Sequence, residues 1–251
     1  MLPIKKYDEK EFFSIKSACS ISARILDELT NYIKPGLSTH DLDKICHGLI
    51  IKENAKPAYF KGYPKTIFTS INSVVRGVPS SNDVLKEGDI INIDIAIYFD
   101  GFYGSTSRMY YVGRKIPRVA QLLCERTAKS LELAIDTICP GRTVDTVIET
   151  IKKNIEPYGY SFVSHGLKNI NVDDVFCEDN LNGALEEGMI FMLSPIINLS
   201  SKETSTLKDG WSVITKDQRL SAHFSHCIGV IKDGCEVFTR SHYPTQAGIL
   251  R

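Results

Sequence analysis

Residues 90–101 read Ile-Ile-Asn-Ile-Asp-Ile-Ala-Ile-Tyr-Phe-Asp-Gly, an alternation of large apolar side chains with polar or small ones. Alternation with a period of two is typical of a strand that buries one face. The closing Asp-Gly pair predicts a tight two-residue turn, and the aromatic-rich residues 102–112 supply the partner strand. That turn sets Asp94 opposite Ser107 and Ala96 opposite Ser105, so Ser105 becomes the diagonal neighbour of Asp94.

Helices are predicted on both sides of this hairpin along the chain. Apolar residues recur at intervals of three and four in four segments: 11–33, a segment opened by a capping-box pattern at Ser38 and Asp41, 118–138 and 143–156. The remaining strand-like segments are 160–164, 189–198, 211–215 and 221–231. Because helices and strands group rather than alternate, we expect an α+β fold with a curved antiparallel sheet flanked by helices.

No linker or low-complexity tract divides the chain, so we expect a single domain over residues 1–251, with residues 240–251 as a loosely attached tail.

Charge and cysteine usage exclude several classes of protein. The chain has 251 residues, with 30 basic residues balancing 30 acidic ones, so no net charge recruits nucleic acid or a membrane surface. Seven cysteines without a Cys-x-x-Cys pair argue against a disulfide framework and a structural zinc site. No apolar run reaches the roughly 18 residues of a membrane span. We therefore expect a cytoplasmic protein with no nucleic-acid or membrane partner.

Seven short motifs occur in an order that resembles type I methionine aminopeptidases of the bacterial form, over residues 10–239. The motifs are Thr69-Ser-Ile-Asn72, Gly88-Asp-Ile-Ile-Asn-Ile-Asp94, Asp100-Gly-Phe-Tyr-Gly-Ser-Thr-Ser-Arg108, His165-Gly166, Glu187-Gly-Met189, Lys208-Asp-Gly-Trp211 and Leu220-Ser-Ala222. The resemblance implies the pita-bread fold, in which two pseudo-symmetric halves enclose two divalent metal ions such as Co, Mn, Fe or Zn.

In that family two Asp, one His and two Glu hold the metal pair. The corresponding positions here are Asp94, Ser105, His165, Ser194 and Ser225. Anionic oxygens are needed to neutralise two adjacent dications, and a neutral hydroxyl is a poor substitute. The resemblance therefore implies a degenerate metal site, and we expect no metal cofactor and no catalysis.

Two histidines that contact the substrate in the family are also replaced. The segment Val74-Val-Arg-Gly77 is one residue shorter than the family pattern and lacks its histidine, and Val172 stands where the second histidine is expected. Electrostatic stabilisation of a tetrahedral intermediate would be lost with them.

The methionine pocket of the family is matched in part. Tyr63 and Trp211 match pocket positions, Phe60 stands where a Tyr is usual, and Phe68 replaces a small Cys. Packing inherited with the fold explains Tyr63 and Trp211 as well as ligand contact does.

Three functions remain open. The favoured one is a non-catalytic binding protein whose partners are peptide N-termini, nascent chains or the ribosome. The alternative is an active methionine aminopeptidase, or another metallohydrolase, with a rebuilt single-metal site at Asp94, His165 and His223. The least favoured is metal-free hydrolysis by a serine with His165 and Asp94.

A buried Asp94 without metal needs another partner. Arg76 is the predicted partner in an ion pair, with Lys168 as the second candidate.

Overall fold

The predicted hairpin lies at the centre of the molecule. Strands β4 (Ile90–Phe99) and β5 (Phe102–Tyr111) are antiparallel, and their register pairs Asp94 with Ser107 and Ala96 with Ser105 as predicted. The turn residues Asp100 and Gly101 have φ of 48° and 88°, which is the left-handed conformation that such a turn requires. The structure is a computed structural model that describes residues 4–58, 63, 65–78, 81–170 and 183–241.

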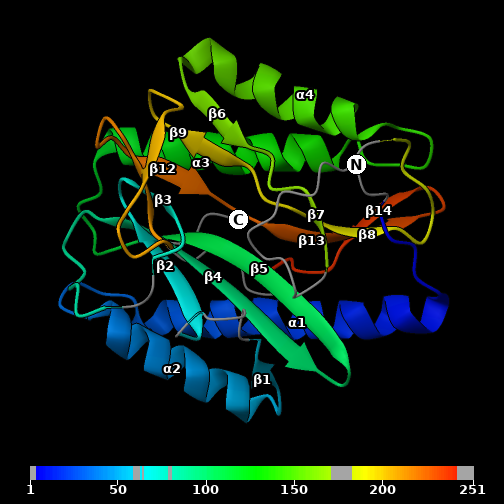
Figure 1. Ribbon diagram of the computed structural model, residues 1–251, viewed down its shortest axis with the longest axis horizontal. Coiled ribbons are helices and arrows are strands. Elements are labelled where there is room, and N and C mark those ends of the chain that lie inside the picture. The colour runs from blue at the N-terminus through cyan, green and yellow to red at the C-terminus, as the bar shows by residue number, and fades with distance from the viewer. Residues whose placement is uncertain (1–3, 59–62, 64, 79–80, 171–182, 242–251) are drawn as a thin grey trace.

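Two helices cover the apolar face of the hairpin (Figure 1). Asp8 caps α1 (Glu9–Leu29) through a full capping box, and Ser38 caps α2 (Thr39–Lys52) by accepting from the backbone N–H of Asp41. The predicted box at Ser38 is half formed, because the Asp41 carboxylate accepts from the Ser38 hydroxyl rather than from its backbone N–H. A short 3-10 helix, Thr30–Tyr32, follows α1.

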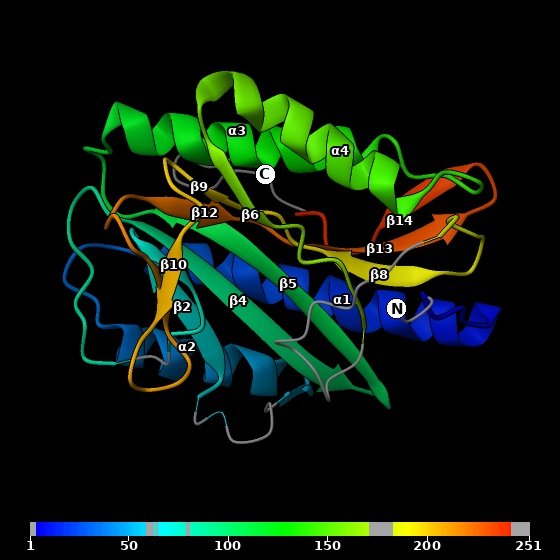
Figure 2. The same ribbon diagram turned by 45° about the horizontal axis from the view of Figure 1, so that its top comes forward.

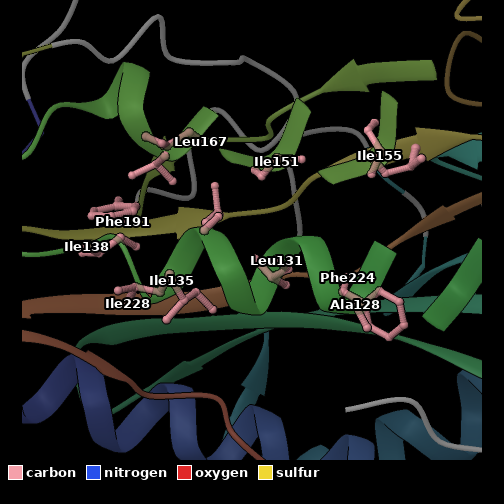
Figure 3. Packing of buried hydrophobic residues seen from close by; sticks show 14 of the residues in the cluster. Ala128, Leu131, Ile135, Ile138, Ile151, Ile155, Leu167, Phe191, Phe224 and Ile228 are labelled. Atoms are coloured by element: carbon pink, nitrogen blue, oxygen red, sulfur yellow. The ribbon is translucent and has the colours of Figure 1, made fainter. Parts of the chain in front are cut away.

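A second pair of helices covers the other half of the molecule. In Figure 3, side chains of α3 (Arg118–Ile135) and α4 (Val144–Ile155) pack against Phe191 and Ile228 of two strands and against Phe224, which lies between two strands. The 3-10 helix Glu156–Tyr158 follows α4. Helices therefore lie on both outer sides of the strands, as Figure 2 shows from a second angle.

The other strands are short and antiparallel wherever they pair. They are β1 (Lys56–Pro57), β2 (Ile67–Ile71), β3 (Val74–Arg76), β6 (Ser161–Ser164), β7 (Lys168–Asn169), β8 (Ile190–Leu193), β9 (Ile196–Asn198), β10 (Thr204–Thr206), β11 (Val213–Thr215), β12 (Ser221–His223), β13 (His226–Ile231) and β14 (Gly234–Val237). They form four sheets, ordered β1-β4-β2 with β5 on β4, β10-β11-β3, β12-β9-β6 and β14-β13-β8-β7. The α+β class with antiparallel sheets is confirmed.

Two strands predicted as continuous are each divided between two sheets. Segment 189–198 separates at Pro195 into β8 and β9, because proline cannot donate a ladder hydrogen bond. Segment 221–231 separates at Phe224 and Ser225 into β12, which pairs with β9, and β13, which pairs with β8. Hence His223 and Ser225 do not belong to one regular strand.

Helix α1 is in unusually close contact with β5. A Cβ on Gly104 would overlap the backbone of Ala18, so only glycine allows the two elements to approach this closely. The buried Arg108 of β5 forms an ion pair with Asp27 of α1, and the hydroxyl of Ser241 donates to the same carboxylate at 2.6 Å. This Asp27–Arg108–Ser241 link joins α1 and the last described residue to the hairpin.

The predicted loose tail is wrong for its first two residues. Arg240 forms an ion pair with Glu132 at 3.0 Å, and Ser241 contacts Asp27, while residues 242–251 lie outside the described residues. No helix in the described ranges has both the length and the apolar character needed to cross a membrane.

Candidate functional site

Side chains from four separate segments form one row across the sheets. Phe68 of β2 and Ser107 of β5 both lie opposite Asp94 of β4, one on each side. Ser107 in turn forms an isolated bridge with Ser225, whose backbone N–H donates to the Ser107 carbonyl at 3.2 Å. Residues paired across antiparallel strands place their side chains on the same face. The site row Phe68, Asp94, Ser107 and Ser225 therefore lies on the face of β4 that points away from α1 and α2.

The remaining family positions adjoin the ends of this row. Ser105 is the diagonal neighbour of Asp94, as predicted. The ladder between β8 and β13 pairs Leu193 with His226, so Ser194 and Ser225 are the next residues at its end. The backbone N–H of Ser194 donates to the carbonyl of His165 at 3.1 Å. The fold thus brings together the positions that the sequence assigned to one site.

The carboxyl group of Asp94 lies in a buried environment that disfavours its ionised form. Burial raises its pKa to about 6, and the charge of Lys168 opposes this rise. The predicted ion pair with Arg76 is wrong, since no such contact within 4 Å occurs in the described part of the chain. The reason is topological: Arg76 ends strand β3, beside β11 and β12, and its charge acts on His223. Lys168, the second candidate, is the cation that acts on Asp94.

The alternative metal set does not assemble. His223 is buried, and burial together with the charges of Arg76 and Lys168 lowers its pKa to about 3. Its backbone carbonyl accepts a hydrogen bond from the Asn92 amide at 2.7 Å. Among the described residues there is no group of three His, Cys, Asp or Glu side chains able to hold a metal ion. Asp94, His165 and His223 therefore do not form the predicted single-metal site.

The donor set also does not suit the two divalent ions that the resemblance implies. Asp94 is the only carboxylate at the five family positions, where the family has four. The hydroxyl of Ser225 is buried and has no hydrogen-bond partner in the described structure, and the same is true of Ser107. Neutral hydroxyls in this row cannot neutralise two dications.

An aromatic cluster lies beside the row. The Tyr63 ring is 4.0 Å from the Phe68 ring and 5.3 Å from the Trp211 ring between centroids. The Tyr63 hydroxyl donates to the carbonyls of Ile67 and Val78 at 2.9 and 3.2 Å, so its orientation is fixed. Burial, and then the charges of Asp43 and Asp94, raise the Tyr63 pKa. Phe68 pairs with Asp94 across the strands, so the cluster and the carboxyl are neighbours. Three of the four predicted pocket residues therefore come together, and Phe60, like Val172, lies outside the described residues.

Sequence reasoning missed a set of buried polar atoms around the row. Besides Ser107 and Ser225, the buried atoms without a partner in the described structure include Oδ1 of Asn92, which lies on the same face of β4 as Asp94. The signal available in the sequence was Asn92 and Asp94 on the polar face of an otherwise apolar strand. Buried polar groups without partners are rare in native proteins and call for an explanation.

Comparisons with known proteins place this geometry in a family. Residues 14–232 match metallopeptidase family M24. The chain is 39% identical over 252 residues to a methionine aminopeptidase of Rickettsia prowazekii, covering 96% of each chain. It is 38% identical over 237 residues to a methionine aminopeptidase of Escherichia coli, covering 90% of this chain and 89% of the other.

Solved structures agree with this relationship. The crystal structure of the Rickettsia prowazekii methionine aminopeptidase matches with a TM-score of 0.88 and 38% identity, covering 94% of this chain and all of the other. The Thermotoga maritima methionine aminopeptidase matches with a TM-score of 0.86 and 26% identity over 95% of this chain and all of the other. A prolidase from Pyrococcus furiosus, at 17% identity and a TM-score of 0.73, shares the fold over 95% of this chain and 66% of its own. The predicted pita-bread fold is confirmed.

Proposed function

Because the chain belongs to the methionine aminopeptidases of metallopeptidase family M24, we propose that it is a methionine-aminopeptidase-like protein that has lost catalysis and binds peptide N-termini. The observation that carries the proposal is that the fold gathers Asp94 with Ser105, Ser194 and Ser225, so that the site has one carboxylate where the family has four. A row with one carboxylate cannot hold the metal pair on which water activation in this family depends.

The binding half of the proposal rests on the aromatic cluster. Tyr63 and Phe68 are buried, whereas Trp211 is only partly buried and packs against the Tyr63 ring at the edge of the cluster. An apolar first side chain would pack on Trp211. The α-ammonium of the same peptide would pair with Asp94, the one anion at the site. Nascent chains, at or away from the ribosome, are the natural source of such N-termini.

The proposed location is the cytosol. The six described cysteines, Cys19, Cys46, Cys124, Cys139, Cys227 and Cys235, are free thiols, which suits a reducing compartment. The balanced charge supports peptide partners over nucleic acid.

Metal content and cleavage test the loss of catalysis. The full chain is incubated with cobalt or manganese, desalted and analysed for bound metal, then assayed on a Met-Ala-Ser peptide. We expect no tightly bound metal pair and no turnover above a chelator-treated sample. Two equivalents of tightly bound metal, or turnover that a chelator abolishes, would contradict the proposal.

Fluorescence of the single tryptophan tests the binding function. Titration with Met-Ala-Ser should change Trp211 emission saturably, whereas the N-acetylated peptide should not. Asp94→Asn should weaken binding at least about tenfold, because it removes a charge-assisted contact. The exposed Asp233→Asn is the matched control and should leave binding unchanged. Equal binding of the free and acetylated peptides would refute recognition of the amino group.

The second candidate is an active aminopeptidase, and the names of the relatives favour it. A triple variant with Ser105→Asp, Ser194→Glu and Ser225→Glu distinguishes the inactive binding protein from the active aminopeptidase. If the proposal holds, the variant binds metal and the natural chain does not. If the natural chain already binds and cleaves, the active alternative is correct.

A further inference from the structure

A strap formed by residues 239–241 contacts the half of the molecule that contains α3 and β13. Arg240 forms a two-pronged ion pair with Glu132 of α3, with N–O distances of 3.4 and 3.0 Å. The carboxylate of Glu132 also lies 3.8 Å from Nε2 of His226, the first residue of β13. On its other side the His226 ring contacts the strap directly, because Nδ1 lies 2.9 Å from the Thr239 hydroxyl. The first contact path of the strap therefore leads from Arg240 through Glu132 to His226.

The last residue of the strap contacts the other half of the molecule. The hydroxyl of Ser241 donates to Asp27 of α1 at 2.6 Å, and Asp27 forms the buried ion pair with Arg108 of β5. Helix α1 shares an apolar cluster with the hairpin, whereas α3 and β13 share a different one. The second contact path thus leads from Ser241 through Asp27 to Arg108, and two adjacent residues of the strap bind opposite halves.

Both contact paths end directly behind the site row. Ser107 and Ser225 form the bridge between the halves, in which the Ser225 N–H donates to the Ser107 carbonyl at 3.2 Å. Arg108 follows Ser107 in the chain, and His226 follows Ser225. Successive side chains along a strand point to opposite faces, so Arg108 and His226 point away from the site row. The strap therefore contacts each partner of the bridge one residue further on, from the reverse face of the sheet.

The bridge between the halves gains support from these contacts. It is an isolated bridge rather than part of a ladder, and the Thr106 hydroxyl adds a hydrogen bond to the Ser225 carbonyl at 2.8 Å. The contact paths are buried close to the sheet, since Thr239, Asp27 and Arg108 are each at most 4% exposed. A buried polar group that loses its partner costs free energy, so the contact paths resist separation of the halves.

We propose that Arg240 and Ser241 are positioning residues of the candidate site, because the strap holds Ser225 against Ser107 from the reverse face of the sheet. Arg240 acts on the Ser225 side and Ser241 on the Ser107 side. Release of the strap loosens the junction between the halves without changing any residue of the site row. The inference does not depend on what the site binds, because the junction can be measured without peptide or metal.

Amide hydrogen exchange of the full-length chain tests this role. The Ser225 N–H reports on the bridge, whereas the amides of β4 report on the stability of the whole domain. In a variant with both Arg240→Gln and Ser241→Ala, Ser225 should exchange at least about tenfold faster, because each contact path loses a charge-assisted hydrogen bond. The amides of β4 should change by less than about threefold. Equal acceleration at Ser225 and in β4 would mean that the strap only adds general stability, which overturns the proposal.

A matched variant and a rescue assign the effect to the strap. Arg142→Gln with Ser17→Ala removes the same two side-chain types elsewhere, since Arg142 is exposed and the Ser17 hydroxyl donates within α1. It should leave Ser225 exchange unchanged. Arg240→Lys retains a cation beside Glu132 and should exchange more slowly at Ser225 than Arg240→Gln does. If Ser225 exchanges equally in the strap variant and the matched variant, the proposal is overturned.

Discussion

The two faces of strand β4 differ in how well their side chains are satisfied. On the helix side Ile91, Ile93, Ile95 and Ile97 are each at most 1% exposed and pack in one cluster with α1 and α2. On the other side Asn92 Oδ1 has no partner in the described part of the chain, and Asp94 is held at a raised pKa. The same ten residues thus combine a face of closely packed apolar side chains with a face on which polar groups lack hydrogen-bond or charge partners among the described residues.

This difference separates the side chains that maintain the fold from those that form the candidate site. Apolar packing on one face stabilises the domain without reference to any ligand. Polar groups on the other face cost free energy unless something binds to them, which is typical of functional sites. Substitutions on the two faces should therefore change stability in opposite directions.

The largest effect is expected on the helix side. Ile93→Ala should lower the free energy of unfolding by about 3–4 kcal/mol, because it leaves a cavity in the cluster under α1 and α2. Chemical denaturation measures this change in the free energy of unfolding, with Ser105→Ala on the opposite face as the control. If the two variants lose equal stability, the contrast between the faces does not exist.

An intermediate effect of opposite sign is expected at Asp94. Its folded pKa of about 6 lies above its usual 3.8, so the ionised form is disfavoured in the folded state. That cost is present in full above about pH 6 and disappears as pH falls towards 4. Asp94→Asn should therefore stabilise the protein by about 2 kcal/mol at pH 7.5, after allowance for partial exposure, and not at pH 4. Denaturant unfolding curves of both proteins at both pH values test this prediction. A gain in stability that does not depend on pH would show that ionisation of Asp94 is not the cause.

The smallest effect is expected at the buried hydroxyl of Ser107. Ser107→Ala removes a hydroxyl that has no partner among the described residues and should stabilise the protein by about 1 kcal/mol. Differential scanning calorimetry detects a change of this size. A clear loss of stability would mean that the hydroxyl is hydrogen-bonded and that both faces of the hairpin are satisfied.

Local patterns predicted the hairpin well. The alternation over 90–99 identifies the first strand, and the turn at Asp100 and Gly101 sets its register with the second strand. The pairing of Asp94 with Ser107 therefore followed from the residues alone. Helix starts at Ser38 and Thr143 were also marked by side chains that cap their own helices. Such signals lie within a few positions of the structure that they specify.

Contacts between distant segments could not be predicted in this way. Strand 221–231 is divided because Phe224 and Ser225 carry the chain from one sheet to another, which no local period records. The choice between Arg76 and Lys168 as the cation near Asp94 depended on how β3 and β7 are placed around β4. The family positions were found by motif order, but the row that joins Asp94, Ser107 and Ser225 required the fold.

The Asp27–Arg108–Ser241 link has a consequence for synthesis on the ribosome. The carboxylate of Asp27 emerges early, but the hydroxyl that donates to it stands 214 positions later. At roughly 5–20 residues per second, the helix waits roughly 10–40 s for that partner. During this interval α1 can dock on the hairpin through Arg108, yet the Asp27 carboxylate gains its hydrogen bond from Ser241 only after residue 241 has been made. Helix α1 is thus synthesised well before the contact at Asp27 that joins it to Ser241 can form.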